Sequence, residues 1–97
     1  MTTSAIEETS AVRKAERTAA RVIDGRAVVI VIDDHKVHAL NEVGTRIWEL
    51  ADGRSLGEIV DTLVEEFEIS REAARSDAFK FVGELAALGA VEVGAGA

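Results

Sequence analysis

The sequence contains no cysteine, which excludes a disulfide framework, a thiolate nucleophile and a zinc site of the cysteine type. It has no internal repeat and no run of apolar residues long enough to span a bilayer. Its start, MTTSAIEETS, shows no basic stretch followed by an apolar run. With 97 residues, of which 47% are hydrophobic, the chain is expected to form one small domain. We interpret it as soluble and cytoplasmic, with no membrane partner, no metal and no other cofactor.

Basic charge is also scarce, because 11 Lys and Arg residues face 18 Asp and Glu residues and leave a net charge of −7. The excess of acid is densest over residues 55–68, which contain no basic residue. The acidic residues of this stretch are Glu58, Asp61, Glu65, Glu66 and Glu68. Such a surface repels the phosphate backbone of DNA or RNA. The charge pattern therefore predicts no nucleic-acid partner.

The first half of the chain predicts strands. Residues 1–18 are rich in Ala, Thr and Glu, offer few large apolar side chains, and are expected to form a flexible arm. Strands are expected at 19–24 and 27–32, because β-branched residues flank Asp24-Gly25, a dipeptide typical of type I′ hairpin turns. A short third strand is expected at 36–40.

The second half predicts three helices. Asn41 is a suitable N-cap for the first, and Ser55 with Glu58 forms a capping box for the second. Ser70 is expected to cap a third helix that ends before Gly89. This order predicts an α+β, winged-helix-like fold, a three-stranded antiparallel sheet followed by three helices, with the third strand at an edge. After a last extended piece at AVEV, residues 94–97 are expected to be a flexible tail.

The third helix carries two apolar stripes. The first, at three- and four-residue spacing, is a complete core-facing seam formed by Ala74, Ala78, Phe81, Leu85 and Leu88. The second lies about 100° further around the helix and comprises Arg75, Phe79, Val82 and Ala86. Spacing alone leaves two interpretations of the second stripe open, namely packing in the core or in a homodimer, and one wall of a ligand groove.

Three segments resemble the PqqD family, whose winged-helix module is known as the RiPP recognition element. They are RVIDGRAVVIVID, HALNEVGTRIWELADGRSLGEIVDTLVEEF and AARSDAFKFVGELAALGAVE, and together they cover about residues 19–93. The most specific features are Leu40-Asn41, Ile47-Trp48 followed by Asp52-Gly53, and the ending LAALGAV. The resemblance predicts a peptide-binding domain over residues 19–93.

The resemblance implies a non-enzymatic protein that binds the leader region of a ribosomally made precursor peptide and presents it to a modifying enzyme. In the family the leader adds as a strand to the third strand and lies against the third helix. The implied partner enzyme belongs to radical-SAM, lasso-type or other machinery, and the oligomeric state is a monomer or a homodimer. The implied strand edge is Lys36, Val37, His38 and Ala39, and the implied groove wall is Arg75, Phe79, Val82 and Ala86. Relatives often carry aromatic residues before the Leu-Asn pair, where this chain has Val37, His38 and Ala39.

Other interpretations have weaker support. The sequence contains neither a glycine-rich phosphate loop nor a nucleophile-base arrangement, so an enzyme is disfavoured. A winged-helix DNA-binding regulator and a subunit that binds only a partner enzyme stay as alternatives. His35 and His38 lie three residues apart in an extended segment, so their rings do not converge on a metal. For Trp48, core packing is preferred to a binding role, and for Arg75 the alternatives are a ligand contact and pairing with Glu72 or Asp77.

Overall fold

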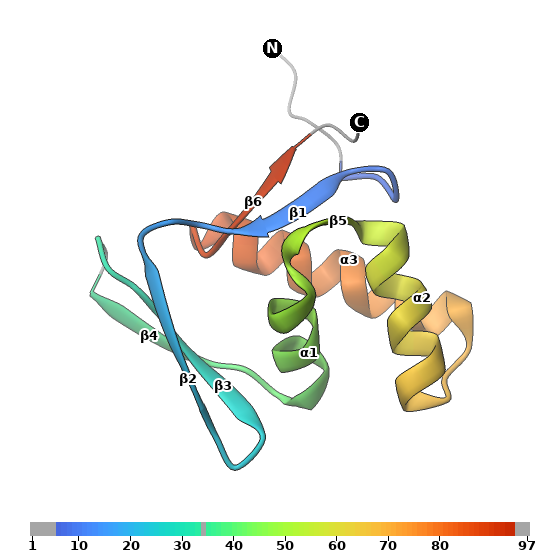
Figure 1. Ribbon diagram of the computed structural model, residues 1–97, viewed down its shortest axis with the longest axis horizontal. Coiled ribbons are helices and arrows are strands. Elements are labelled where there is room, and N and C mark those ends of the chain that lie inside the picture. The colour runs from blue at the N-terminus through green and yellow to red at the C-terminus, as the bar shows by residue number, and fades with distance from the viewer. Residues whose placement is uncertain (1–5, 34, 95–97) are drawn as a thin grey trace.

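A computed structural model describes residues 6–33 and 35–94 of the chain, and Figure 1 shows its helices and strands. The elements are β1 (Ala11–Lys14), β2 (Thr18–Ile23), β3 (Arg26–Val31), β4 (Lys36–Ala39), α1 (Glu42–Leu50), β5 (Asp52–Ser55), α2 (Leu56–Phe67), α3 (Arg71–Ala87) and β6 (Val91–Gly94). The strands form two three-stranded sheets, in the orders β2-β3-β4 and β5-β1-β6. The predicted α+β class is confirmed, and the second sheet is an addition to the prediction.

The β2-β3-β4 sheet matches the three predicted strands. Its hairpin turns at Asp24 and Gly25, whose φ angles of 54° and 79° are the left-handed values that a type I′ turn requires. Strand β3 is central, since it pairs antiparallel with β2 on one side and with β4 on the other. Strand β4 is therefore at an edge of this sheet, as predicted.

All three helices begin at the predicted caps. The side-chain oxygen of Asn41 accepts from the N–H of Gly44 at 2.8 Å. Ser55 and Glu58 form the reciprocal capping box at the start of α2, and Ser70 accepts from the N–H of Ala73 at the start of α3. Gly89 follows α3 with a φ of 80°, the conformation that ends helices at this position. Local sequence signals thus fix where each helix begins.

The expectation of a flexible arm over residues 1–18 is wrong for the residues that the structure describes. Strand β1 lies between β5 and β6 and pairs antiparallel with both, as Figure 1 shows. The side chain of Val12 is fully buried, and the N–H groups of Leu56 and Gly57 donate to the carbonyls of Ser10 and Glu8 at 2.9 and 2.8 Å. The segment is ordered because two strands distant in sequence, β5 and β6, supply its backbone partners. Residues 1–5 lie outside the described residues.

The domain boundary at residue 93 also shifts slightly. The predicted extended piece AVEV corresponds to β6, which includes Gly94 and pairs with β1 over its whole length. Residues 95–97 of the expected tail lie outside the described residues. Within the described part of the chain, no helix combines the length and the apolar character that crossing a membrane requires.

One core joins the helices to both sheets. Its largest fully buried side chains include Ile47 of α1, Leu56, Ile59 and Leu63 of α2, and Leu85 of α3. Ala27, Val29 and Val31 of β3 contribute one face of the β2-β3-β4 sheet to it. Trp48 is 5% exposed and belongs to the same core, which confirms packing as its role.

Candidate functional site

The free edge of β4 is the first part of the site. Among the described residues β4 pairs only with β3, in the register Val31 with Lys36, Ile30 with Val37, Val29 with His38 and Val28 with Ala39. In an antiparallel pair each residue directs both its N–H and its C=O to the same side, and successive residues alternate. One alternate set of β4 residues therefore bonds β3, and the other set faces away from the sheet.

Two backbone hydrogen bonds decide which set is free. The N–H of Leu40 donates to the carbonyl of Ala27 at 2.8 Å, so Leu40, His38 and Lys36 direct their backbone groups toward β3. The N–H of Ile32 donates to the carbonyl of Arg17 at 2.9 Å, so the even-numbered residues of β3 bond toward β2. The odd-numbered residues of β3, including Ala27, are then the ones that bond β4, which agrees with the assignment. The backbone groups of Val37 and Ala39 consequently point outward from the edge.

Side chains on β4 alternate between two faces. His38 lies opposite Val29, a fully buried residue, and is itself half-buried on the core side of the sheet. Val37 lies opposite Ile30 on the other face and is 62% exposed. Lys36 and Ala39 are exposed as well. A strand added at this edge would therefore place alternate side chains toward the core side and toward the outer face.

The second half of α3 contacts α1, which follows β4, and the glycine after the end of α3 approaches β3. At the end where β4 leads into α1, a Cβ placed on Gly44 would lie 3.0 Å from Cε1 of Phe81 and 3.3 Å from Oδ1 of Asn41. At the other end, a Cβ on Gly89 would lie 4.0 Å from Cγ1 of Val31, the residue opposite Lys36. Phe81, which is half-buried, therefore faces α1, and the end of α3 at the half-buried Leu88 lies close to β3, next to the position that pairs with Lys36.

This placement corrects the predicted groove wall. A residue of a groove wall has to be at least partly exposed, but Val82 is fully buried in the core together with Ala74, Ala78 and Leu85. Ala86 is half-buried and packs against the same core. Helical spacing correctly groups the residues of each stripe, but it does not say which neighbour a helix face contacts. In the structure, residues of both stripes pack in the same core.

Arg75 and Phe79 lie on the side of α3 that meets the N-terminal segment. Nε of Arg75 donates to Oε2 of Glu8 at 2.8 Å, and the guanidinium stacks 4.4 Å from the centre of the Phe79 ring. Neither predicted partner on the helix, Glu72 or Asp77, pairs with Arg75 in the described residues. The structure therefore does not bring Arg75 and Phe79 together with β4.

Glu8 links the N-terminal segment to α3 through two arginines. Its other carboxylate oxygen accepts from Arg71 at 2.7 Å, and Arg71 also approaches Asp61 of α2 at 3.4 Å. Hydrogen bonds from Arg71 and then Arg75 hold the pKa of Glu8 below its ordinary value of 4.5. Sequence reasoning missed this arrangement, because Glu8 and Arg71 are 63 residues apart and no local pattern connects them.

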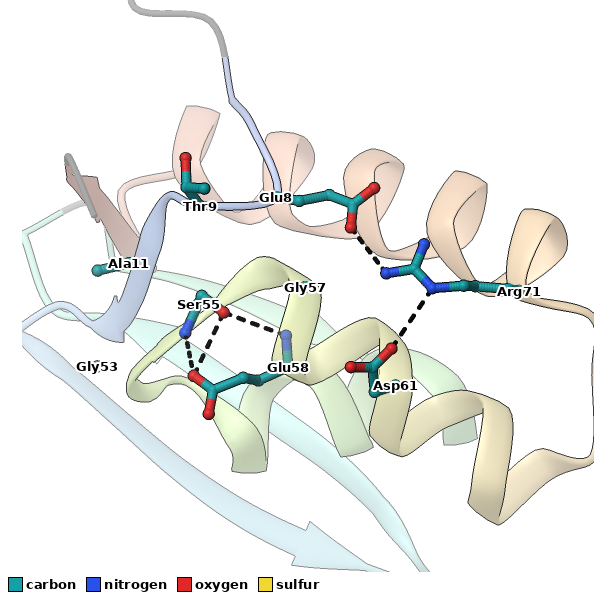
Figure 2. Close-up of a pocket in the computed structure, with 9 residues that line it drawn as sticks. All are labelled: Glu8, Thr9, Ala11, Gly53, Ser55, Gly57, Glu58, Asp61 and Arg71. Carbon is teal, nitrogen blue, oxygen red and sulfur yellow. Dashed lines mark hydrogen bonds and ion pairs between the residues drawn. The ribbon is translucent and has the colours of Figure 1, made fainter. Parts of the chain in front are cut away.

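These groups border a pocket of about 450 Å³, which Figure 2 shows. Arg71 reaches between the carboxylates of Glu8 and Asp61, while Ser55 and Glu58 satisfy each other in the capping box. The charged groups of the pocket thus have partners within it, and none of its lining residues belongs to β4. No cluster of three or more His, Cys, Asp or Glu residues suited to a metal occurs among residues 6–33 and 35–94.

The fold and the strand edge together define a small winged-helix-like α+β domain in which no strand of the described residues covers the β4 edge. The family model described as coenzyme PQQ synthesis protein D matches residues 26–91, more than half of the chain. The chain therefore belongs to the PqqD family, which confirms the resemblance inferred from its sequence.

Solved structures share this fold. The chain is similar to "TbiB1 in Complex with the TbiA(beta) Leader Peptide", with a TM-score of 0.77 and 27% identity over 82% of this chain and 94% of that chain. It is also similar to "Lasso peptide synthetase B1 complexed with the leader peptide", with a TM-score of 0.73 and 23% identity over 84% and 96%.

A third similar structure is the PqqD part of Methylobacterium extorquens PqqCD, described as a functional, stand-alone RiPP recognition element. Its TM-score is 0.75 at 16% identity, over 91% of this chain and 95% of that chain. No curated protein sequence matches the chain.

Proposed function

We propose that this protein binds the leader region of a ribosomally synthesised precursor peptide as a strand added to β4, and presents the peptide to a modifying enzyme. The observation that carries the proposal is the outward direction of the backbone groups of Val37 and Ala39. Membership in the PqqD family, and similarity to two proteins whose structures contain leader peptides, support it.

The edge supplies up to four backbone hydrogen bonds, namely one N–H and one C=O from each of Val37 and Ala39. Each bond contributes a net stabilisation of about 1 kcal/mol, because the peptide exchanges water for protein partners. Backbone bonding at this level gives affinity with little sequence preference, so side-chain contacts must provide the selectivity.

Leader side chains on the core side of the sheet would meet His38 and the part of α3 that bears Phe81 and Leu88. All three residues are half-buried, so an apolar leader side chain placed there would bury further area. We propose this side of α3 as the wall of the site, in place of the stripe that includes Val82. Lys36, Val37, His38 and Ala39 stay in the proposed site.

The proposed role needs no catalytic step within the chain. The chemistry would be supplied by a peptide-modifying enzyme of radical-SAM or lasso type, and a ribosomal precursor peptide places the protein in the cytoplasm. The protein contributes an extended, ordered presentation of the leader, which reduces the entropy lost when the enzyme engages the peptide.

Amide hydrogen exchange tests the proposal at single residues. The leader is taken from a short precursor gene sought beside the gene of this protein, and it is titrated into ¹⁵N-labelled protein. We expect the amides of Val37 and Ala39 to exchange quickly in the free protein and to become protected on binding. The amide of His38, already bonded to β3, is the internal control.

The opposite edge of the same sheet is the second control. Strand β2 pairs only with β3 among the described residues, so Ala20 and Val22 also direct their backbone groups outward. If Ala20 and Val22 became protected in place of Val37 and Ala39, the peptide would bind at β2, and the β4 site would be refuted. Absence of any protection at saturating leader would refute strand addition.

A further inference from the structure

The outer face of the β2-β3-β4 sheet, on the side opposite the core, carries exposed large apolar side chains from all three strands. Ile23, Ile30 and Val37, one from each strand, are 54%, 39% and 62% exposed. Val28 is half-buried between them. We define these four residues as the outer sheet face.

The register shows that these side chains form one continuous surface. Ile30 lies directly opposite Val37 on β4 and opposite Ala19 on β2. Residues directly opposite each other in antiparallel strands point to the same face. The alternate residues of β3 are buried under the helices, so the outer sheet face is the side that no described element covers.

A depression of about 400 Å³ occupies the β2 side of this surface. It is lined by Ala19, Ala20, Arg21, Ile23, Val28 and Ile30. A contiguous apolar surface with a hollow is typical of a site for another macromolecule, whereas single exposed apolar residues need no explanation.

The charged side chains that β2, β3 and β4 themselves place on the outer sheet face are basic, against the acidic balance of the whole chain. Arg21 and Arg26 lie in β2 and β3 on the same side as Val28 and Ile23, as their register positions show. Both arginines are exposed, and neither forms an ion pair within the described residues. The surface is therefore complementary to a partner that is apolar at its centre and acidic at its rim.

We propose that the outer sheet face is the docking surface for the modifying enzyme, through an apolar patch with acidic residues around it on that enzyme. This inference rests on the proposed function, because the leader would be held on β4, at the edge of the same sheet. A second copy of the chain fits less well, since a two-fold contact would bring Arg21 and Arg26 of both copies into one interface without any acidic partner from the described residues of this face.

The outer sheet face is small for a protein–protein interface. Three strands about 4.8 Å apart, each presenting about 17 Å of length, offer roughly 250 Å². A stable complex buries about 800 Å² per partner, so the face alone supports only a weak contact. A leader strand on β4 would widen it by a fourth strand beside Val37. The bound peptide is therefore expected to strengthen docking of the enzyme.

Binding measurements with two purified probes test this proposal separately from leader binding. The probes are the leader peptide and the modifying enzyme encoded with the precursor peptide. The test variant is the double substitution Ile23→Thr, Ile30→Thr, which retains β-branched residues in both strands. We expect its affinity for the enzyme to fall about tenfold, or 1.4 kcal/mol, while its affinity for the leader stays within twofold of the original.

Two matched controls accompany the double variant. Val22→Thr changes an equally exposed valine, 52% accessible, whose register position is on the other side of β2, and should leave enzyme binding unchanged. Arg21→Glu should weaken enzyme binding, whereas Lys80→Glu on α3 makes the same change in net charge and should not. Unfolding curves identify any variant that fails to fold.

The affinities for the enzyme and the leader distinguish the possible occupants of the outer sheet face. Unchanged enzyme affinity in the double variant, or an equal loss in Val22→Thr, would overturn the docking surface. A dimer in the original protein that the double variant dissociates would assign the face to a second copy instead. Failure of the original protein to bind the leader would refute the proposed function, and the enzyme measurements would still report on the surface.

Discussion

The N–H of Leu40 donates to the carbonyl of Ala27 at 2.8 Å, while the N–H of Ala27 donates to Oγ1 of Thr45 at 2.7 Å. The strand ladder between β3 and β4 therefore ends at this pair. The N–H of Ala27 bonds a side chain of α1 and not the carbonyl of Leu40. Asn41 follows at once as the N-cap of α1. This arrangement explains why a strand of four residues passes into a helix without a loop. It also determines which β4 residues direct their backbone groups toward β3 and which direct them outward.

Proline substitutions at neighbouring positions should separate folding from peptide binding. Proline removes one backbone N–H, and the N–H of Val37 faces outward while that of His38 faces β3. We expect Val37→Pro to retain a cooperative fold and to lose most leader affinity. His38→Pro should destabilise the fold by about 3 kcal/mol, comparable to proline in a regular element.

Calorimetry with the leader and chemical unfolding of both variants provide the measurements. Val37→Ala is the control for the lost side chain, because it keeps the N–H. Equal destabilisation by both prolines would show that β4 is not a free edge in solution. Leader binding that survives Val37→Pro would show that the peptide docks elsewhere.

Local signals in the sequence predicted one part of the fold well. The turn at Asp24-Gly25, the N-cap Asn41 and the capping box of Ser55 with Glu58 each depend on residues within a few positions of one another. Such signals are legible without tertiary information. The edge position of β4 was inferred from the order of the elements, three strands followed by three helices.

Contacts between distant segments could not be predicted. Strand β1 has only four residues, AVRK, and a single fully buried side chain, so it shows no clear alternation. It becomes a strand because β5 and β6 bond it on both sides. The burial of Val82 was missed for a related reason: periodicity gives the angle between two helix stripes, but tertiary packing decides that Phe81 faces α1 and that Val82 is fully buried.

The first described strand should be needed for stability. Val12 lies on β1, the central strand of its sheet, and its side chain is fully buried in the core. Val12→Ala should reduce the free energy of unfolding by about 2 kcal/mol, from the lost transfer energy of its methyl groups and the cavity left behind. Arg13→Ala, at the next and exposed position of β1, is the control and should change stability little. Thermal unfolding of both variants is the measurement. Equal stability of Val12→Ala and the original protein would show that β1 is detached in solution.

Acid should release the N-terminal segment from α3. The arginine partners Arg71 and Arg75 lower the pKa of Glu8 in the folded protein below 4.5. Because the folded pKa is depressed, the stabilising effect of Glu8 is present at neutral pH and is lost as the pH falls through that lower pKa. Protection of the Gly57 amide, which donates to the Glu8 carbonyl, should therefore weaken on acidification.

Glu8→Gln should reproduce this loss at neutral pH and flatten the acid dependence at Gly57. Glu7→Gln removes the same charge from the neighbouring exposed residue and serves as the control. Hydrogen exchange at Gly57 from pH 7 to pH 3 is the measurement. Equal pH profiles for the original protein and Glu8→Gln would mean that other groups control the segment.

Thr45 should be the polar residue on which the junction between β3 and α1 depends. Its hydroxyl is buried, with the residue 4% exposed, and it accepts the hydrogen bond from the N–H of Ala27. Thr45→Val keeps the shape of the side chain but leaves that buried N–H without a partner, which costs about 1–3 kcal/mol. Thr45→Ser keeps the hydroxyl and should lose less, since only a methyl group is removed. Because Ala27 also holds Leu40, Thr45→Val should speed amide exchange at Leu40 and at His38 more than at Ile32, which bonds on the β2 side. Equal stability of the Val and Ser variants, or uniform exchange across the sheet, would show that packing and not this hydrogen bond joins the strand edge to the helices.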